Sequence, residues 1–188
     1  MFDGVSAEVA QLLVRCYGEP HRAYHDTTHI AEVLGWYRWV EREVGWDRPE
    51  DVYAAILWHD AIYDPLAKDN EQRSAELAIA HGASPRTAEL ILLTARHGRL
   101  SAGELDRDAC HFLDCDTAIL GGDDLAFDRY DRAIRAEYAA VPDEDFRRGR
   151  RAFLEGMRAR PRIFLSDLFH ARLDAAARAT LDRALRRL

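Results

Sequence analysis

Histidine and aspartate side chains recur at positions that a helical register turns inward. His29 lies in the first turn of an apolar helical pattern, His59 and Asp60 are adjacent in a second one, and Asp116 belongs to a third. Imidazole nitrogens and carboxylate oxygens together suit a divalent transition metal, with waters filling the remaining positions. We therefore expect one metal ion held by His29, His59, Asp60 and Asp116. A purely structural polar cluster is the alternative.

The register of the segment "DACHFLDCDTAILGG" separates its two central aspartates. Asp116 shares a stripe with Phe112 and Leu113, whereas Asp114 is two residues away and projects from nearly the opposite side of a helix. A carboxylate in an apolar interior must be paired, hydrogen-bonded or bound to a cation. We therefore expect Asp116 to be the buried aspartate and Asp114 to tolerate substitution.

The elements that must position these side chains are helices. Apolar residues recur at three- and four-residue steps, and no sustained period of two occurs. Ser84 is a suitable N-cap, Pro49 and Pro85 suit first turns, and Gly45 and Gly82 suit helix ends. These signals predict an all-α fold of about eight to nine helices, at residues 5–17, 27–44, 49–63, 69–81, 85–97, 106–120, 123–140, 143–158 and 167–187.

Composition limits the classes of protein that fit. The chain has 188 residues, 48% of them apolar, so one domain over residues 1–188 is expected, with a signature core at 21–120 completed by helices at 123–188. A net charge of −7 argues against a general nucleic-acid binder. Three cysteines without a CxxC pair suggest reduced thiols. The absence of a signal-like start and of a membrane-length apolar run predicts a cytoplasmic protein without a membrane partner.

The ordered motifs resemble a known superfamily. The pattern of His29, then His59 and Asp60, then Asp116 resembles the signature of the HD-domain metal-dependent phosphohydrolases, which are all-helical. The segments "RAYHDTTHI", "AILWHDAIYDP", "DNEQRSAELA", "LTARH", "FLDCDTAILG" and "IRAEY" are similar to a group of small bacterial proteins described as predicted metal-dependent HD phosphohydrolases. Tyr24, His25 and His29 also resemble the Tyr-His-Asn-x-x-His arrangement of cyclic-nucleotide phosphodiesterases, with Asp26 in place of Asn.

The resemblance implies a reaction and a set of roles. It implies hydrolysis of a phosphate ester, with His29 as a metal ligand and His25 as the proton donor to the leaving group. A bound metal would lower the pKa of a water and polarise a phosphoryl oxygen, and Asp60 or Asp116 could hold that water as well as the cation. The metal could be Mn, Co, Ni, Mg, Fe or Zn. We expect Glu71 to orient ligands or water in support of catalysis.

Three further residues are candidates for substrate binding. Arg22 could meet a phosphate through its planar guanidinium, Tyr24 lies within the motif, and His97 could contact substrate or ligate a second metal, although one metal is preferred. Residues 147–188 carry twelve arginines against four acidic side chains. We interpret the arginines at 147, 148, 150 and 151 as a solvent-exposed basic face, unless their helix folds over the pocket.

Two other functions compete with the enzyme. The same pocket could bind metal and a nucleotide without turnover, as a sensor module, or the metal could tie helices together in an interaction protein. Pure binding needs no proton donor such as His25, and structural zinc sites are normally closed by four protein donors that include thiolates. We therefore favour a phosphohydrolase acting on a small phosphorylated substrate, of which a nucleotide is the leading candidate. A second copy of the chain, in a homo-oligomer, is the other partner that we consider.

Overall fold

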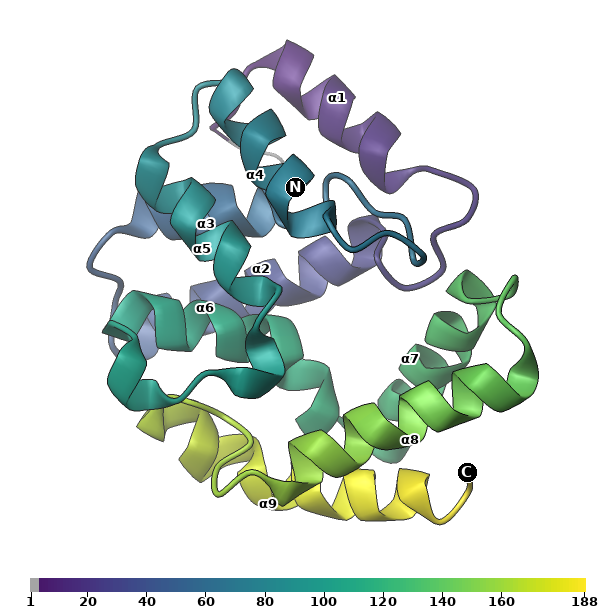
Figure 1. Ribbon diagram of the computed structural model, residues 1–188. Helices are drawn as coiled ribbons and strands as arrows, with labels where there is room; N and C mark the ends of the chain where they lie inside the picture. The colour runs from purple at the N-terminus through teal and green to yellow at the C-terminus, as the bar shows by residue number, and fades with distance from the viewer. Residues whose placement is uncertain (1–3) are drawn as a thin grey trace.

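The structure, a computed structural model, describes residues 4–188, so the first three residues of the expected domain lie outside the described part. The described chain is all-helical, as predicted (Figure 1). Its nine α-helices are α1 (Ala7–Tyr17), α2 (Thr27–Glu43), α3 (Pro49–Trp58), α4 (Asn70–Ala80), α5 (Pro85–Thr94), α6 (Arg107–Thr117), α7 (Asp124–Glu137), α8 (Asp143–Ala159) and α9 (Asp167–Leu185). Three 3₁₀ turns join them, η1 (His97–Arg99), η2 (Ala102–Glu104) and η3 (Ala118–Gly121).

Local signals explain where the helices start and end. The Ser84 hydroxyl accepts a hydrogen bond from the backbone N–H of Thr87, and Asp26 accepts from the N–H groups of Thr28 and His29 at the start of α2. Gly45 and Gly82 have φ of 71° and 88°, which a side chain would disfavour. The predicted helix starts therefore agree with the structure within one or two residues.

Two helices end earlier than the expected ends at residues 63 and 97. Helix α3 stops at Trp58, because the N–H of Ala61 donates to the Trp58 carbonyl three residues back and the N–H of Ile62 donates to the Ser74 hydroxyl, so the four-residue helical pattern is not continued. Helix α5 stops at Thr94, and the chain continues through η1. Both early ends matter for the site, because they free His59, Asp60 and His97 from a regular helical register.

The core lies between helices from both halves of the chain. Helices α2, α3 and α6 pack against one another in the middle of the molecule, α4 and α5 cover α3, and α9 packs on α8 and η3 (Figure 1). Ile30, Ile56, Phe112 and Phe169 are fully buried members of this core. No helix within residues 4–188 is long and apolar enough to cross a membrane.

Candidate metal centre

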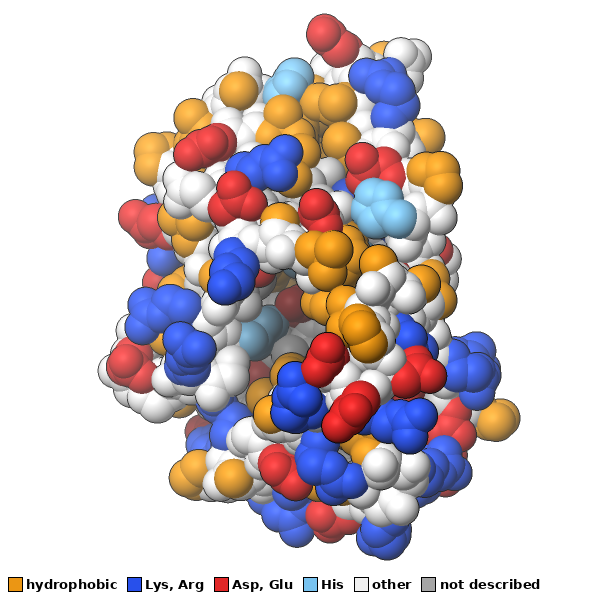
Figure 2. All heavy atoms as spheres, turned by 45° about the vertical axis from the view of Figure 1, so that its right-hand side comes forward, with side chains coloured by type: hydrophobic (Ala, Val, Ile, Leu, Met, Phe, Trp, Pro, Cys, Tyr) orange, Lys and Arg blue, Asp and Glu red, His pale blue; other side chains and the backbone are white. Residues whose placement is uncertain are grey.

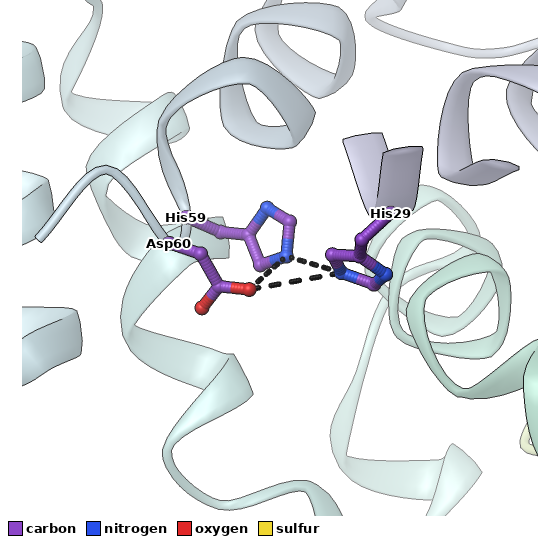
Figure 3. Close-up of side chains that lie close together, drawn as sticks. All are labelled: His29, His59 and Asp60. Carbon is purple, nitrogen blue, oxygen red and sulfur yellow. Dashed lines mark hydrogen bonds and ion pairs between the residues drawn. The ribbon is translucent and has the colours of Figure 1, made fainter. Parts of the chain in front are cut away.

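Four side chains from α2, the end of α3 and α6 meet at one point. The Nε2 atoms of His29 and His59 are 3.3 Å apart, and Asp60 Oδ2 lies 3.6 Å from the first and 3.1 Å from the second. Figure 3 shows these three side chains pointing toward one another. Asp116 Oδ1 lies 3.1 Å from His29 Nε2 and 3.3 Å from His59 Nε2. The structure therefore brings together all four residues that the sequence predicted as metal ligands.

Hydrogen bonding prepares the cluster to accept a cation. His59 donates its Nδ1–H to the carbonyl of Ile56 at 3.0 Å, so its Nε2 directs a lone pair at the cluster when the ring is neutral. His29 is 3% exposed, and its Nδ1 is a buried nitrogen without a hydrogen-bond partner in the described chain. His29, His59 and Asp60 each offer one ligand atom, all within 4.8 Å of one another, and Asp116 adds a carboxylate oxygen beside the two imidazoles. Such a mixed nitrogen and oxygen donor set fits a divalent transition metal.

The charges of the cluster favour positive charge at its centre. Burial by itself lowers the pKa of His59, but the nearby Asp60 and Asp116 carboxylates outweigh it and hold the pKa well above the usual value. Burial raises the pKa of Asp116, yet His59, His29 and His97 bring it well below its usual range. Protons and a metal ion therefore compete for the same position.

The two aspartates of α6 correct one prediction. Asp114 is the more buried of the two at 1% exposure, whereas the Asp116 side chain is 15% exposed. Asp114 accepts hydrogen bonds from the backbone N–H of Leu165 and from both the N–H and the hydroxyl of Ser166, at 2.6–2.7 Å. The expectation that only Asp116 is buried was wrong, because α6 is covered on both sides and the segment before α9 packs over Asp114.

His97 completes the rim of the cluster. Its Nε2–H donates to the carbonyl of Leu113 at 2.8 Å, and its Nδ1 lies 3.5 Å from Asp116 Oδ2. Asp116 thus faces the His29 and His59 pair with one oxygen and His97 with the other. His97 is placed to orient Asp116, while the roles of substrate contact or second-metal ligand stay predictions.

A buried glutamate holds His25 beside the cluster, and sequence reasoning missed it. Glu137 Oε2 accepts the His25 Nδ1–H at 2.7 Å and the Tyr63 hydroxyl at 2.9 Å. Its Oε1 accepts the backbone N–H groups of Ala23, Tyr24 and His25 at 2.7–2.9 Å. The ring centroids of His25 and His29 are 5.8 Å apart. With Nδ1 engaged, Nε2 is the nitrogen of His25 left to act on a ligand.

The electrostatics of this pair are mutually reinforcing. Burial lowers the pKa of His25, but the charges of Asp60 and Glu137 outweigh it, so the pKa is raised. Burial raises the pKa of Glu137, but hydrogen bonds from His25 and from backbone N–H groups bring it to about 2. His25 therefore stays protonated to a higher pH than an ordinary histidine, which suits a proton donor.

Two of the remaining predicted residues lie at the site in different roles. Arg22 is buried and donates to the carbonyls of His25, Asp60 and Ala61 at 2.7–3.1 Å. Its expected role in binding phosphate is wrong, because these carbonyls and the Glu19 carboxylate already accept hydrogen bonds from its guanidinium. Its guanidinium instead fixes the backbone at His25 and at Asp60. The Tyr24 ring packs 4.8 Å from His29, centroid to centroid.

Glu71 is not joined to the cluster by any hydrogen bond or ion pair in the described chain, and it lines a neighbouring cavity. This cavity, of about 640 Å³, lies between the 63–71 segment and helices α7 and α8, and His25 borders it. Figure 2 shows that this face of the molecule is hollowed, with a histidine side chain set back inside the opening. A second hollow, bordered by Tyr24, His29 and Asp116, lies beside α2. Small molecules can thus approach the cluster from cavities of ligand size.

Helix α8 does fold over this cavity. Of its four clustered arginines, those at positions 147, 148 and 151 are exposed, as expected, whereas Arg150 is only 7% exposed and borders the cavity. The interpretation of all four as a solvent-exposed basic face was therefore wrong for Arg150. The reason is that α8 turns one side of its surface toward α7 and the cavity.

The arrangement joins a candidate cation site, an imidazole oriented by a buried carboxylate and an adjacent cavity. Comparison with protein-family models, with curated proteins and with solved structures finds no match for this chain.

Proposed function

We propose that this protein is a metal-dependent phosphohydrolase of the HD type, acting on a nucleotide or another small phosphorylated metabolite. The observation that supports the proposal most is the position of His25 next to the four-residue cluster. A site that only bound metal would not need a third imidazole, held beside the cluster by a buried carboxylate. The expected cofactor is one divalent ion bound by His29, His59, Asp60 and Asp116.

The ion would supply Lewis acidity, lowering the pKa of a coordinated water and polarising a phosphoryl oxygen. Asp60, whose side chain is 17% exposed, is placed to accept a hydrogen bond from the attacking water. His25 donates its Nε2 proton to the departing alkoxide. Before the transfer, the Glu137 carboxylate stabilises the positively charged His25 imidazolium. After the transfer, it still accepts the Nδ1–H and keeps the ring oriented.

A sensor module would differ from an enzyme in one measurable property, the turnover of substrate. The direct test is metal analysis of protein purified without chelator, followed by phosphate release from a panel of nucleotides and small phosphate esters with Mn, Co, Ni, Mg and Zn. We expect metal-dependent release that a chelator abolishes. Tight binding of a ligand without release from any ester would support the sensor module and contradict the enzyme.

A further inference from the structure

The cavity beside His25 contains a buried cationic donor with no acceptor. Arg150 donates from Nε to Asp131 at 2.9 Å and from Nη1 to the Tyr130 hydroxyl at 3.1 Å. Its remaining nitrogen, Nη2, is buried and has no hydrogen-bond partner in the described chain. A buried donor left unpaired is costly, and a ligand oxygen in the cavity would satisfy it.

The guanidinium is held in place, as a recognition group must be. Its central carbon lies 4.8 Å from the Tyr130 ring centroid and 5.2 Å from that of Phe153. Asp131 and Tyr130 fix two of its nitrogens, so the direction of the third is set by the fold. This rigidity favours a specific acceptor over a loosely bound counter-ion.

The rest of the lining indicates what the ligand is. Aromatic rings from three segments border the cavity, among them Tyr63, Tyr138, Phe146 and Phe153, and Phe153 is 41% exposed. Such rings accept a flat ring system. The charged side chains of the lining besides Arg150 are one lysine, at position 68, and two acidic residues, Glu71 and Asp145. Apart from His25, which we assign to the scissile ester, the lining has as many basic as acidic side chains, which does not favour a second phosphate.

We propose that this cavity receives the leaving group of the substrate, an uncharged flat ring with a carbonyl oxygen that accepts a hydrogen bond from Arg150 Nη2. Nucleosides whose base has a keto oxygen at C6 of a purine or at C4 of a pyrimidine are the chemical class that we assign to it. The inference rests on the proposed function for one step only, the placement of the scissile ester oxygen at His25. Arg150 is then the residue that determines specificity, and a nucleoside monophosphate is the substrate class.

The test uses the full chain and nucleosides without phosphate, so that binding is measured apart from hydrolysis. Calorimetric titration compares inosine with adenosine and uridine with cytidine, pairs in which an amino group replaces the keto oxygen at C6 or at C4. The C2 carbonyl is common to uridine and cytidine, so their difference reports the C4 position alone, and ribose serves as the blank. We expect the keto nucleosides to bind at least tenfold more tightly. The substitution Arg150→Met removes the donor and should abolish this preference, whereas Arg151→Met, at an exposed position of the same helix, should preserve it.

A second variant guards against misfolding of Arg150→Met. Phe153 is partly exposed at the cavity, so Phe153→Ala should keep the fold and weaken all four nucleosides alike. Equal affinity of the wild type for inosine and adenosine, or a keto preference that survives in Arg150→Met, would overturn the inference. Hydrolysis of phosphate esters without nucleoside binding would contradict the nucleoside pocket but not the proposed hydrolase function. Arg150-dependent inosine binding without hydrolysis of any ester would do the reverse.

Discussion

His25 is the residue on which the distinction between enzyme and binding module depends. Its ring is held by Glu137 and packs 4.2 Å from the Tyr63 ring, centroid to centroid, so it is oriented without being a member of the metal cluster. A side chain in this position can be removed while the four proposed ligands stay in place. The proton transfer proposed for His25 can therefore be tested separately from the proposed metal binding.

Replacing His25 with Ala should lower turnover by about a hundredfold to ten-thousandfold, the usual contribution of a positioned general acid. Metal content should change little. Steady-state phosphate release and metal analysis of the same sample check both expectations. Parallel loss of activity and metal would mean that His25 supports the cluster rather than proton transfer.

Glu137→Gln should change the pH dependence of both activity and stability. Glu137 raises the pKa of His25, and His25 must be protonated to act as the proton donor. In the variant, the fall of the hydrolysis rate at alkaline pH should therefore begin at a lower pH. The folded pKa of Glu137 is about 2, below its usual 4.5, so its stabilisation is present above pH 4.5 and lost as the pH falls toward 2. That loss amounts to about 3 kcal/mol in the wild type.

Rate profiles and urea unfolding at several pH values measure these effects. The variant should lack this acid-sensitive part of the stability. An unmoved alkaline limb in Glu137→Gln would contradict the role assigned to the carboxylate.

Buried hydrogen bonds to a side chain on α6 fix where the neighbouring segment of the chain lies. Asp114 ties α6 to the segment that leads into α9, because both of its oxygens accept hydrogen bonds from Leu165 and Ser166. Burial raises the pKa of Asp114 to about 7, although these hydrogen bonds lower it. Asp116, one half-turn away, faces the cluster instead. Helix α6 therefore carries a structural aspartate on one side and a proposed metal ligand on the other.

Substituting Asp114 with Ala should cost about 2–3 kcal/mol of unfolding free energy, since buried N–H donors lose their acceptors. The metal content of the folded variant should stay near that of the wild type. Asp116→Ala should show the opposite pattern, with metal lost and stability less affected. Urea unfolding and metal analysis of both variants decide between them; an unchanged stability in Asp114→Ala contradicts the structural role.

The helices were predictable from the sequence and the network around His25 was not. Caps such as Ser84 and stripes such as the one that carries His29 are local patterns, and both are confirmed. The partner of His25 is 112 residues away on α7, so no local register could pair them. A signal existed, because Glu137 continues the apolar spacing of Phe127 and Ile134 on its helix. The role of Arg22 was predicted wrongly because most of its acceptors are backbone carbonyls. Every residue has a carbonyl, so the sequence does not indicate which ones an arginine will contact.

The whole molecule is organised around a point where distant segments meet. Helix α2, the end of α3 and α6 each supply proposed ligands, while α7 and α8 supply the neighbouring cavity. A cation bound at this point would join three helices and stabilise the folded state by mass action. Metal content is accordingly the property that most directly links the geometry to the proposed function.

The decisive measurement is the metal content per chain of protein purified without chelator and then dialysed against a divalent metal, for the wild type, Asp116→Ala and Glu71→Gln. Glu71 borders the cavity without joining the cluster, so its variant is the matched acidic control. We expect about one tightly held ion per chain in the wild type and in Glu71→Gln, as one four-donor site predicts, with a large loss in Asp116→Ala. A wild type that retains no ion, or an Asp116→Ala variant that retains it in full, would contradict the account.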